Sequence, residues 1–403
     1  EISACLVGSE MCIRDRYWED MKNVLLIGIG GVYNYGCEAI VRGTVNILKT
    51  INPNVHISYA SYNYEDDVRR LADCDIRIVK RKRIGRWSWR NVLRKLFSHV
   101  NISYKIAYDT TDWLANFDTV FSIGGDIYTL SSTGAYNSTL PNFLEQCQSK
   151  GLKYVLWGAS VGKFENNPSA LAFYKEHLKK IDLIVARESV TVNYLRSLGI
   201  DNNVMLAPDP AFFVESPRIE KKSNDKLTIG INLSPLSALY HYKNIDTAIG
   251  KQAETICGLA KELDCKFIFL PHVLAANPND NDLLYLREIA DIVTNKGYDV
   301  GIIDTDPGFI GLKNNLTRCD FVIAARMHCA VNAITMHVPV LLLSYSEKAK
   351  GMAEYVYGTN KTVISLTDFE NYHNVADIVK CWNYRSRLDE IQKFRFDLLL
   401  QKI

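Results

Sequence analysis

The sequence predicts an α/β protein with two domains, each built on a mainly parallel sheet, with the two domains facing a cleft. Three observations support this prediction. Short apolar, β-branched runs alternate with longer segments of helical period, which is the pattern of βαβ units. The alternation breaks at the polar residues 216–226 and then restarts. The chain has 403 residues, whereas single cores stop growing at roughly 250 to 300 residues.

The expected elements of the first domain, residues 21–215, begin at Met21. Residues 1–20 are set aside as a non-native extension, because residues 1–16 resemble the translation of a sequencing adapter. Helices are expected between the strands, for example over 37–48 and 189–198. The strands are expected at residues 23–30, 55–60, 119–123, 154–158, 183–186 and 204–207.

Residues 216–226 are expected to form a linker, because they are polar, charged and without periodicity. The second Rossmann-like domain then spans residues 227–373. A C-terminal helix is expected over 374–403, long enough to reach back to the first domain. The strands of the second domain are expected at residues 227–233, 266–270, 300–303, 321–324, 340–344 and 362–365.

Composition excludes several classes of protein. The formal net charge of +2 argues against a globally basic nucleic-acid binder. No apolar run approaches the roughly 18 residues that span a bilayer, so we expect a cytoplasmic protein. The ten cysteines lie scattered, without a Cys-x-x-Cys pair, which argues against zinc and against a disulfide framework. We therefore expect neither a metal nor a bound cofactor.

Glycine-rich polar turns follow several strands of the first domain. Glycines there let backbone N–H groups approach a ligand. The dinucleotide fingerprint is absent, because Tyr33 stands in place of its third glycine. Turn geometry or helix capping explains any single turn, but their recurrence at one sheet edge favours a ligand site. The candidate binding residues in these turns are Asn34, Gly36, Gly124, Gly125, Asp126 and Ser160.

Arg187 follows the expected strand 183–186 and so presents a guanidinium at the carboxyl end of that strand. The planar fork of arginine matches carboxylate or phosphate oxygens. A structural ion pair with Glu188 or Asp209 is an equal alternative. Asp209 stands between two prolines, which direct its carboxylate either to a helix cap or to a ligand.

The strongest motif is Arg326-Met-His328, which follows the apolar strand 321–324. A second apolar strand then leads to Lys348. Open α/β sheets bind ligands outside the carboxyl ends of their strands, and helix N-termini there favour anions. The motif therefore predicts a pocket for a small, doubly anionic substrate.

His272 ends another strand of the second domain and is a further binding candidate. A lone histidine in a loop is, however, usually a solvated or capping residue. Asp282 follows within ten residues, and we expect it to cap the next helix.

The region 77–105 is basic, contains tryptophan and has no acidic residue. A solvated helix face explains most of these charges. The alternatives are contact with an anionic membrane, an RNA backbone or a diphosphate-carrying acceptor. Among these we expect peripheral contact with the inner face of the membrane, and no nucleic-acid partner.

Together these motifs resemble the signature of polysaccharide pyruvyl transferases over residues 21–358. The resemblance implies a GT-B-like fold, with Arg326 and His328 as the principal site residues. Departures at Asp126, Cys37 and Lys163 bear on substrate choice more than on fold. The matching segments are Asn34-Tyr-Gly36, Gly124-Gly125, Gly158-Ala-Ser160-Val-Gly162, Ala186-Arg187-Glu188, Asp209-Pro210, Arg326-Met-His328 and Tyr345-Ser-Glu-Lys348.

The resemblance implies that the enolpyruvyl carbons of phosphoenolpyruvate pass to two sugar hydroxyls as a cyclic ketal, with release of phosphate. Arg326 with Lys348, and Arg187 across the cleft, would hold the two anionic groups. His328 is the natural proton-exchanging group. A second base remains open among Asp126, Glu38 and Asp209.

The implied partners are phosphoenolpyruvate and a sugar or lipid-linked oligosaccharide that serves as precursor of a cell-surface glycan. Two other functions remain open from the sequence. One is a GT-B glycosyltransferase that uses a nucleotide sugar, and the other is a catalytically silent glycan-binding protein.

Overall fold

Two compact units make up the chain in the computed structural model. Unit 1 comprises residues 1–31, 44–209 and 394–403, and unit 2 comprises residues 32–43 and 210–393. The structure describes residues 21–81, 112–131, 134, 136, 139–214, 226–344 and 347–401. The extension 1–20, nearly all of the expected linker and most of the basic region 77–105 lie outside the described residues.

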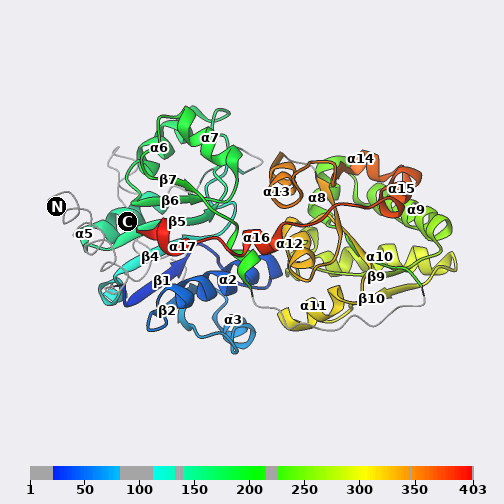
Figure 1. Ribbon diagram of the computed structural model, residues 1–403, viewed down its shortest axis with the longest axis horizontal. Helices are drawn as coiled ribbons and strands as arrows, with labels where there is room; N and C mark the ends of the chain where they lie inside the picture. Colours follow the sequence, from blue (N-terminus) through cyan, green and yellow to red (C-terminus); the bar gives the residue numbers. More distant parts are fainter. Residues whose placement is uncertain are drawn as a thin grey trace, which may run out of the picture. The chain divides into compact units, whose positions relative to one another are not determined.

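Unit 1 contains a parallel sheet of seven strands in the order β3-β2-β1-β4-β5-β6-β7, with helices between the strands (Figure 1). This order reverses between β1 and β4, so a topological switch point lies there. The strands are β1 Asn23–Ile27, β2 His56–Ser61, β3 Arg77–Lys80, β4 Thr119–Ile123, β5 Lys153–Ala159, β6 Leu183–Ala186 and β7 Val204–Leu206. The helices are α3 Tyr64–Arg70, the short turn η1 Asp112–Asn116, α5 Thr139–Ser149, α6 Pro168–Leu178, α7 Ser189–Ser197 and α17 Phe396–Leu400.

Helix α2, Tyr35–Ile51, contributes its first residues to unit 2 and its last residues to unit 1. It begins two residues before the expected start at Cys37, because Asn34 caps it. The Asn34 side-chain Oδ1 accepts from the backbone N–H of Gly36 at 2.8 Å, and its carbonyl accepts from Glu38 at 3.0 Å. An asparagine at this position satisfies N–H groups that the helix itself leaves unpaired.

Strand β3 is the one strand of unit 1 that the sequence did not predict. It is an edge strand beside β2, and its two central apolar residues stand between Arg77 and Lys80. Charged residues on short edge strands discourage pairing with other chains. These charged residues also interrupt the apolar pattern by which strands are predicted from a sequence.

Unit 2 contains a parallel sheet of six strands in the order β10-β9-β8-β11-β12-β13. The switch point lies between β8 and β11. The strands are β8 Thr228–Asn232, β9 Lys266–Phe269, β10 Val300–Ile302, β11 Phe321–Ala324, β12 Val340–Ser344 and β13 Val363–Ser365. The helices are η2 Pro210–Phe213, α8 Pro235–Tyr242, α9 Ile245–Leu263, η3 Pro278–Asp280, α10 Asp282–Asn295, α11 Gly308–Leu316, α12 Met327–Thr335, α13 Glu347–Tyr357, α14 Leu366–Phe369, α15 Tyr372–Lys380 and α16 Leu388–Ile391.

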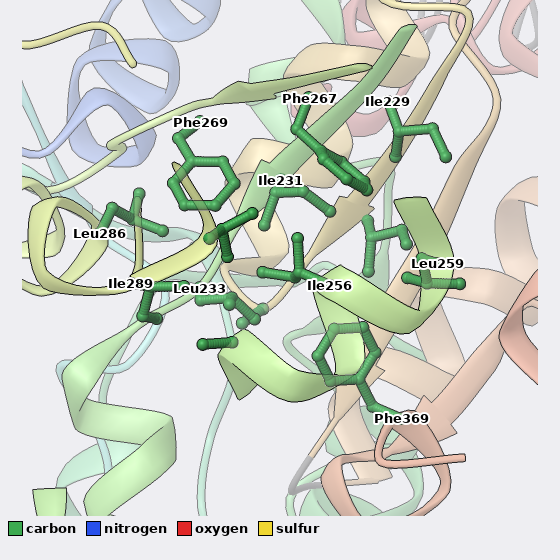
Figure 2. Close-up of a cluster of buried hydrophobic side chains, with 14 of the residues drawn as sticks. Ile229, Ile231, Leu233, Ile256, Leu259, Phe267, Phe269, Leu286, Ile289 and Phe369 are labelled. Carbon is green, nitrogen blue, oxygen red and sulfur yellow. The ribbon is translucent and has the colours of Figure 1, made fainter. Parts of the chain in front are cut away.

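The core of unit 2 lies between one face of this sheet and helices α9 and α10 (Figure 2). Alternate residues of β8 and β9, including Ile231 and Phe267, point into this core beside Ile256 and Leu286. The intervening residues of β8 are also buried. Strands buried on both faces read as continuous apolar runs, which is why the sequence predicted them.

The expected C-terminal helix is wrong as a single element. Three short helices, α15, α16 and α17, occupy this part of the chain. Local polar contacts interrupt the helix after α15, since Ser386 Oγ accepts from the Leu388 N–H and the Trp382 indole donates to the Tyr384 carbonyl. In unit 1, the Phe396 ring of α17 lies 5.3 Å from that of Trp157.

No helix in the described part of the chain has both the length and the hydropathy that crossing a membrane requires.

Candidate active site

The candidate site of unit 2 is built on the loops that leave β8, β9 and β11, which are neighbours in the sheet. Asn232 at the end of β8 ties these loops together. Its Oδ1 accepts from the Arg326 N–H at 2.9 Å, and its Nδ2 donates to the Leu270 carbonyl at 2.9 Å. The carboxyl ends beside the switch point are therefore held in fixed register, as expected for a ligand site in an open α/β sheet.

The Arg326 guanidinium is held by two carboxylates that the sequence did not identify as its partners. Its Nε and Nη2 donate to Asp282 Oδ1 at 3.1 and 2.8 Å, and Nη2 also donates to Asp280 Oδ1 at 2.6 Å. The arginine side chain is 16% exposed. The expectation that Asp282 caps α10 is wrong. The cap is Asn281, whose side chain accepts from the Leu284 N–H.

Opposite charges stabilise Arg326 and Asp282 in their buried positions. Burial disfavours the charge of Arg326, but Asp282 and Asp280 outweigh it and hold its pKa above the usual value. Burial raises the pKa of Asp282, and Arg326 together with two backbone N–H groups opposes the rise. Removing one partner of such a pair would leave an uncompensated buried charge.

His328 is the second residue of α12, and its ring rests against Gly36 in the first turn of α2. A Cβ built on Gly36 would lie 2.7 Å from Cβ and Cγ of His328. Only glycine permits this approach. The N-termini of α2 and α12 therefore meet at His328, and their backbone dipoles favour an anion at this point.

His272 is buried at the end of β9 and joins three parts of the site. Its N–H donates to Asp282 Oδ2 at 3.1 Å, and its carbonyl accepts from the Tyr35 N–H at 3.2 Å. Its Nε2 lies 3.0 Å from Asn332 Nδ2. Burial lowers its pKa well below the usual value, and nearby His328, Arg326 and Lys313 lower it further. His272 is therefore a buried, neutral residue rather than a solvated one.

Unit 1 carries a second polar cluster, at the carboxyl ends of β4 to β7. The buried Arg187 donates from Nε to Ser160 Oγ at 2.9 Å and from Nη1 to Asp209 Oδ2 at 2.8 Å. The ion pair with Asp209, one of two alternatives from the sequence, is thus formed. Burial disfavours the Arg187 charge, but Asp209 and other carboxylates hold its pKa above the usual value.

The glycine pair after β4 makes room for Arg187. A Cβ on Gly125 would lie 2.4 Å from Nη2 of Arg187, and Gly124 has a φ of +124° that only glycine adopts readily. The Gly125 carbonyl also accepts from the Ser160 N–H at 2.7 Å. Asp126 is exposed, with a carboxylate oxygen 3.9 Å from Nη2 of Arg187.

Two predicted features cannot be placed. The side chain of Lys348 lies outside the described residues, as do residues 82–105 of the basic region. Of the basic residues that are described, Arg77 and Lys80 belong to the edge strand β3 rather than to a helix face. Lys80 pairs with Glu65 at 2.5 Å. Among the described residues, no cluster of three or more His, Cys, Asp or Glu side chains could hold a metal ion.

A family model described as polysaccharide pyruvyl transferase matches residues 34–347. No curated protein matches the sequence. Among solved structures, UDP-GlcNAc 2-epimerase from Methanocaldococcus jannaschii has a TM-score of 0.56 at 12% identity, over 94% of this chain and 99% of that chain. The epimerase from Neisseria meningitidis bound to UDP-GlcNAc has a TM-score of 0.55 at 15% identity, over 93% and 94%. A glycosyltransferase from Rickettsia africae has a TM-score of 0.55 at 13% identity, over 94% and 92%. At these identities the likeness shows the fold alone, and it confirms the predicted GT-B-like class.

Proposed function

The chain belongs to the polysaccharide pyruvyl transferase family, and from that premise we propose that it transfers pyruvate from phosphoenolpyruvate to two hydroxyls of a sugar as a cyclic ketal. The observation that carries the proposal is the placement of His328. Its ring lies where two helix N-termini meet, two residues after Arg326, at the carboxyl edge of the unit 2 sheet. The helix N-termini favour an anionic substrate at this position, and the histidine could exchange protons with it.

The chemistry needs both properties. A proton adds to the methylene carbon of phosphoenolpyruvate, and C2 becomes oxocarbenium-like. One sugar hydroxyl attacks C2 and loses its proton, the bond from C2 to the phosphate oxygen breaks, and a second hydroxyl closes the ketal. Phosphate leaves, and the acceptor gains the three pyruvyl carbons. Histidine is the side chain that commonly exchanges protons near neutral pH, and His328 is assigned this role.

Arg326 is assigned a narrower role than the motif suggested. Asp280 and Asp282 already engage its Nε and Nη2, while Nη1 makes no hydrogen bond to any described residue. Arg326 is therefore proposed to fix the start of α12 and to donate from Nη1 to one anionic group of the substrate. Arg187 in unit 1 and Lys348 are further candidates for binding the anion.

The acceptor is proposed to be a cell-surface glycan precursor, free, nucleotide-linked or lipid-linked, met on the cytoplasmic side of the membrane. Mass spectrometry of sugar acceptors incubated with phosphoenolpyruvate would identify it by the added mass of pyruvate minus water. The same incubation releases phosphate, which gives a continuous assay.

His328→Asn and Arg326→Lys test the proposal. His328→Asn keeps a polar side chain of similar reach, and Arg326→Lys keeps a cation beside Asp282, so both are expected to fold. We expect His328→Asn to lose at least about a hundredfold in phosphate release, the contribution typical of a positioned acid–base group. Near-normal turnover in both folded variants would refute the proposal. Stabilisation by UDP but not by phosphoenolpyruvate in a thermal-shift comparison would favour a glycosyltransferase instead.

A further inference from the structure

One face of helix α12 carries three polar side chains at helical spacing. His328, Asn332 and Thr335 are four and three residues apart, so they lie along one stripe of the helix. Each meets a different element of unit 2. His328 contacts Gly36 on α2, Asn332 pairs with His272 after β9, and Thr335 accepts from Lys313 on α11. We call Lys313, Thr335, Asn332 and His272 the buried seam.

Lys313 is the most unusual member of the buried seam. Its side chain is fully buried, its Nζ donates to Thr335 Oγ1 at 2.5 Å, and the Phe309 ring lies 5.4 Å from Nζ. No described carboxylate forms an ion pair with it. Burial lowers its pKa to about 7. A buried cation without a counter-charge destabilises a fold, and an apolar side chain of similar length would avoid that cost.

Asn332 is the second buried polar residue of the seam whose interactions are incomplete. Its side chain is fully buried, and its Oδ1 has no hydrogen-bond partner among the described residues. Its Nδ2 points to Nε2 of His272 at 3.0 Å. With the amide in this orientation its nitrogen donates and Nε2 accepts, so the neutral ring carries its proton on Nδ1. Two buried groups are thus kept at a cost to stability, which is typical of functional rather than structural residues.

We propose that Lys313 and Asn332 are positioning residues that hold a neutral His272 imidazole, with its proton on Nδ1, close to the proton-transfer residue His328. This inference rests on the proposed function for its catalytic part. Hydrogen bonds fix the position of Lys313 on the seam, since its Nζ donates to Thr335 Oγ1, which donates to the Asn332 carbonyl. Below about pH 7, where Lys313 is protonated, it acts through charge, since a cation near His272 disfavours a second one there. Asn332 acts through geometry, since its amide selects one ring nitrogen as acceptor. The other charged or titratable groups near the seam are Glu38 and Arg42 on α2, Asp306 before α11, Asp280 and Asp282 after β9, and Arg326, His328 and Cys329 on or beside α12.

The first experiment needs no substrate. Protein labelled with ¹⁵N and ¹³C at its eight histidines would be titrated by NMR, with the His272 signals assigned from His272→Gln. We expect wild-type His272 to remain neutral and protonated on Nδ1 through the range of pH in which the protein is folded. In Lys313→Met the ring should begin to protonate at a higher pH, and in Asn332→Leu the single tautomer should be lost. A wild-type ring protonated on Nε2, or the wild-type titration and tautomer in both variants, would overturn the inference.

The second experiment separates positioning from folding. In assays below about pH 7, where Lys313 is charged, we expect Lys313→Met to unfold at the same temperature as wild type or higher, yet to lose about ten- to a hundredfold in kcat for phosphate release, with the KM for phosphoenolpyruvate little changed. Lys296→Met, at an exposed lysine of the same unit, is the matched control and should keep wild-type kcat. Unchanged kcat in Lys313→Met would contradict the inference. If wild type itself releases no phosphate with any acceptor, the proposed function fails, and the NMR result still decides the structural part.

Discussion

Gly36→Ala is the sharpest test of the contact between α2 and His328, the residue proposed to transfer protons. The added methyl group would lie 2.7 Å from Cβ and Cγ of His328 and 2.8 Å from its Nδ1. The φ of Gly36 is not in the left-handed region, so alanine strains no backbone. Because the Cβ of His328 is bonded to the backbone, the substitution moves the start of α12 together with the imidazole.

The magnitude follows from the required movement. Ordinary contact begins near 3.4 Å, so His328 must retreat by roughly 0.7 Å with the start of α12, and a misplacement of about 1 Å costs about a hundredfold in rate. We expect kcat to fall roughly thirty- to a hundredfold. Overpacking costs about 1 to 3 kcal/mol, but alanine is favoured over glycine inside a helix by up to about 1 kcal/mol. The net loss of stability should therefore be roughly 0 to 2 kcal/mol.

Phosphate release at saturating phosphoenolpyruvate, together with the unfolding temperature, would measure both effects. Gly30→Ala is the matched control, because a Cβ at Gly30 meets only Tyr62 at 3.6 Å. It should keep wild-type turnover. Wild-type kcat in a folded Gly36→Ala protein would refute the reasoning, because it would mean that the position of His328 does not limit the reaction.

Two further predictions concern Arg187 and Lys313. In Gly125→Ala the new methyl would lie 2.4 Å from Nη2 of Arg187, so the guanidinium must move, and we expect the KM for phosphoenolpyruvate to rise about tenfold, the effect of about 1.4 kcal/mol of lost binding. An unchanged KM would contradict the proposal that Arg187 binds the substrate. Burial lowers the pKa of Lys313 to about 7. Between about pH 7 and pH 10 the unfolded chain therefore still binds a proton that the folded protein has released. The free energy of unfolding should rise with pH over this range. The contribution from this group is at most about 1.4 kcal/mol per pH unit. Urea denaturation across this range should show a steeper rise for wild type than for Lys313→Met, and parallel curves would place the lysine in a solvated environment.

The sequence predicted the central strands of both sheets well because they are buried on both faces and are therefore continuous apolar runs. It missed β3, whose apolar residues are too few to give a pattern. Motif reasoning also placed Arg326, His328, His272 and Arg187 correctly after strands, since chain order fixes which residues follow a strand.

The sequence could not predict which residues form ion pairs and hydrogen bonds with one another. The loop that carries Asp280 and Asp282 reaches Arg326 only through the folding of β9 beside β8 and β8 beside β11. Likewise, Lys313 stands next to two asparagines and looks like part of a solvated surface. Only the packing of α11 against α12 buries it. These pairings join residues far apart in the chain, and no local pattern records them.

The division of α2 between the two units has a consequence for the modularity of the protein. Residues 32–43 lie between strands β1 and β2 of the unit 1 sheet in the chain, yet they cluster with unit 2 and supply Gly36 against His328. A fragment that begins after the region 216–226 would carry Arg326, His328 and all six strands of the second sheet, but it would lack the surface on which His328 rests. Gene fission or domain exchange at that seemingly natural boundary should therefore yield a well-folded sheet with an incomplete site. Insertion or permutation points that keep residues 32–43 joined to the second sheet are the ones that preserve the histidine's surroundings.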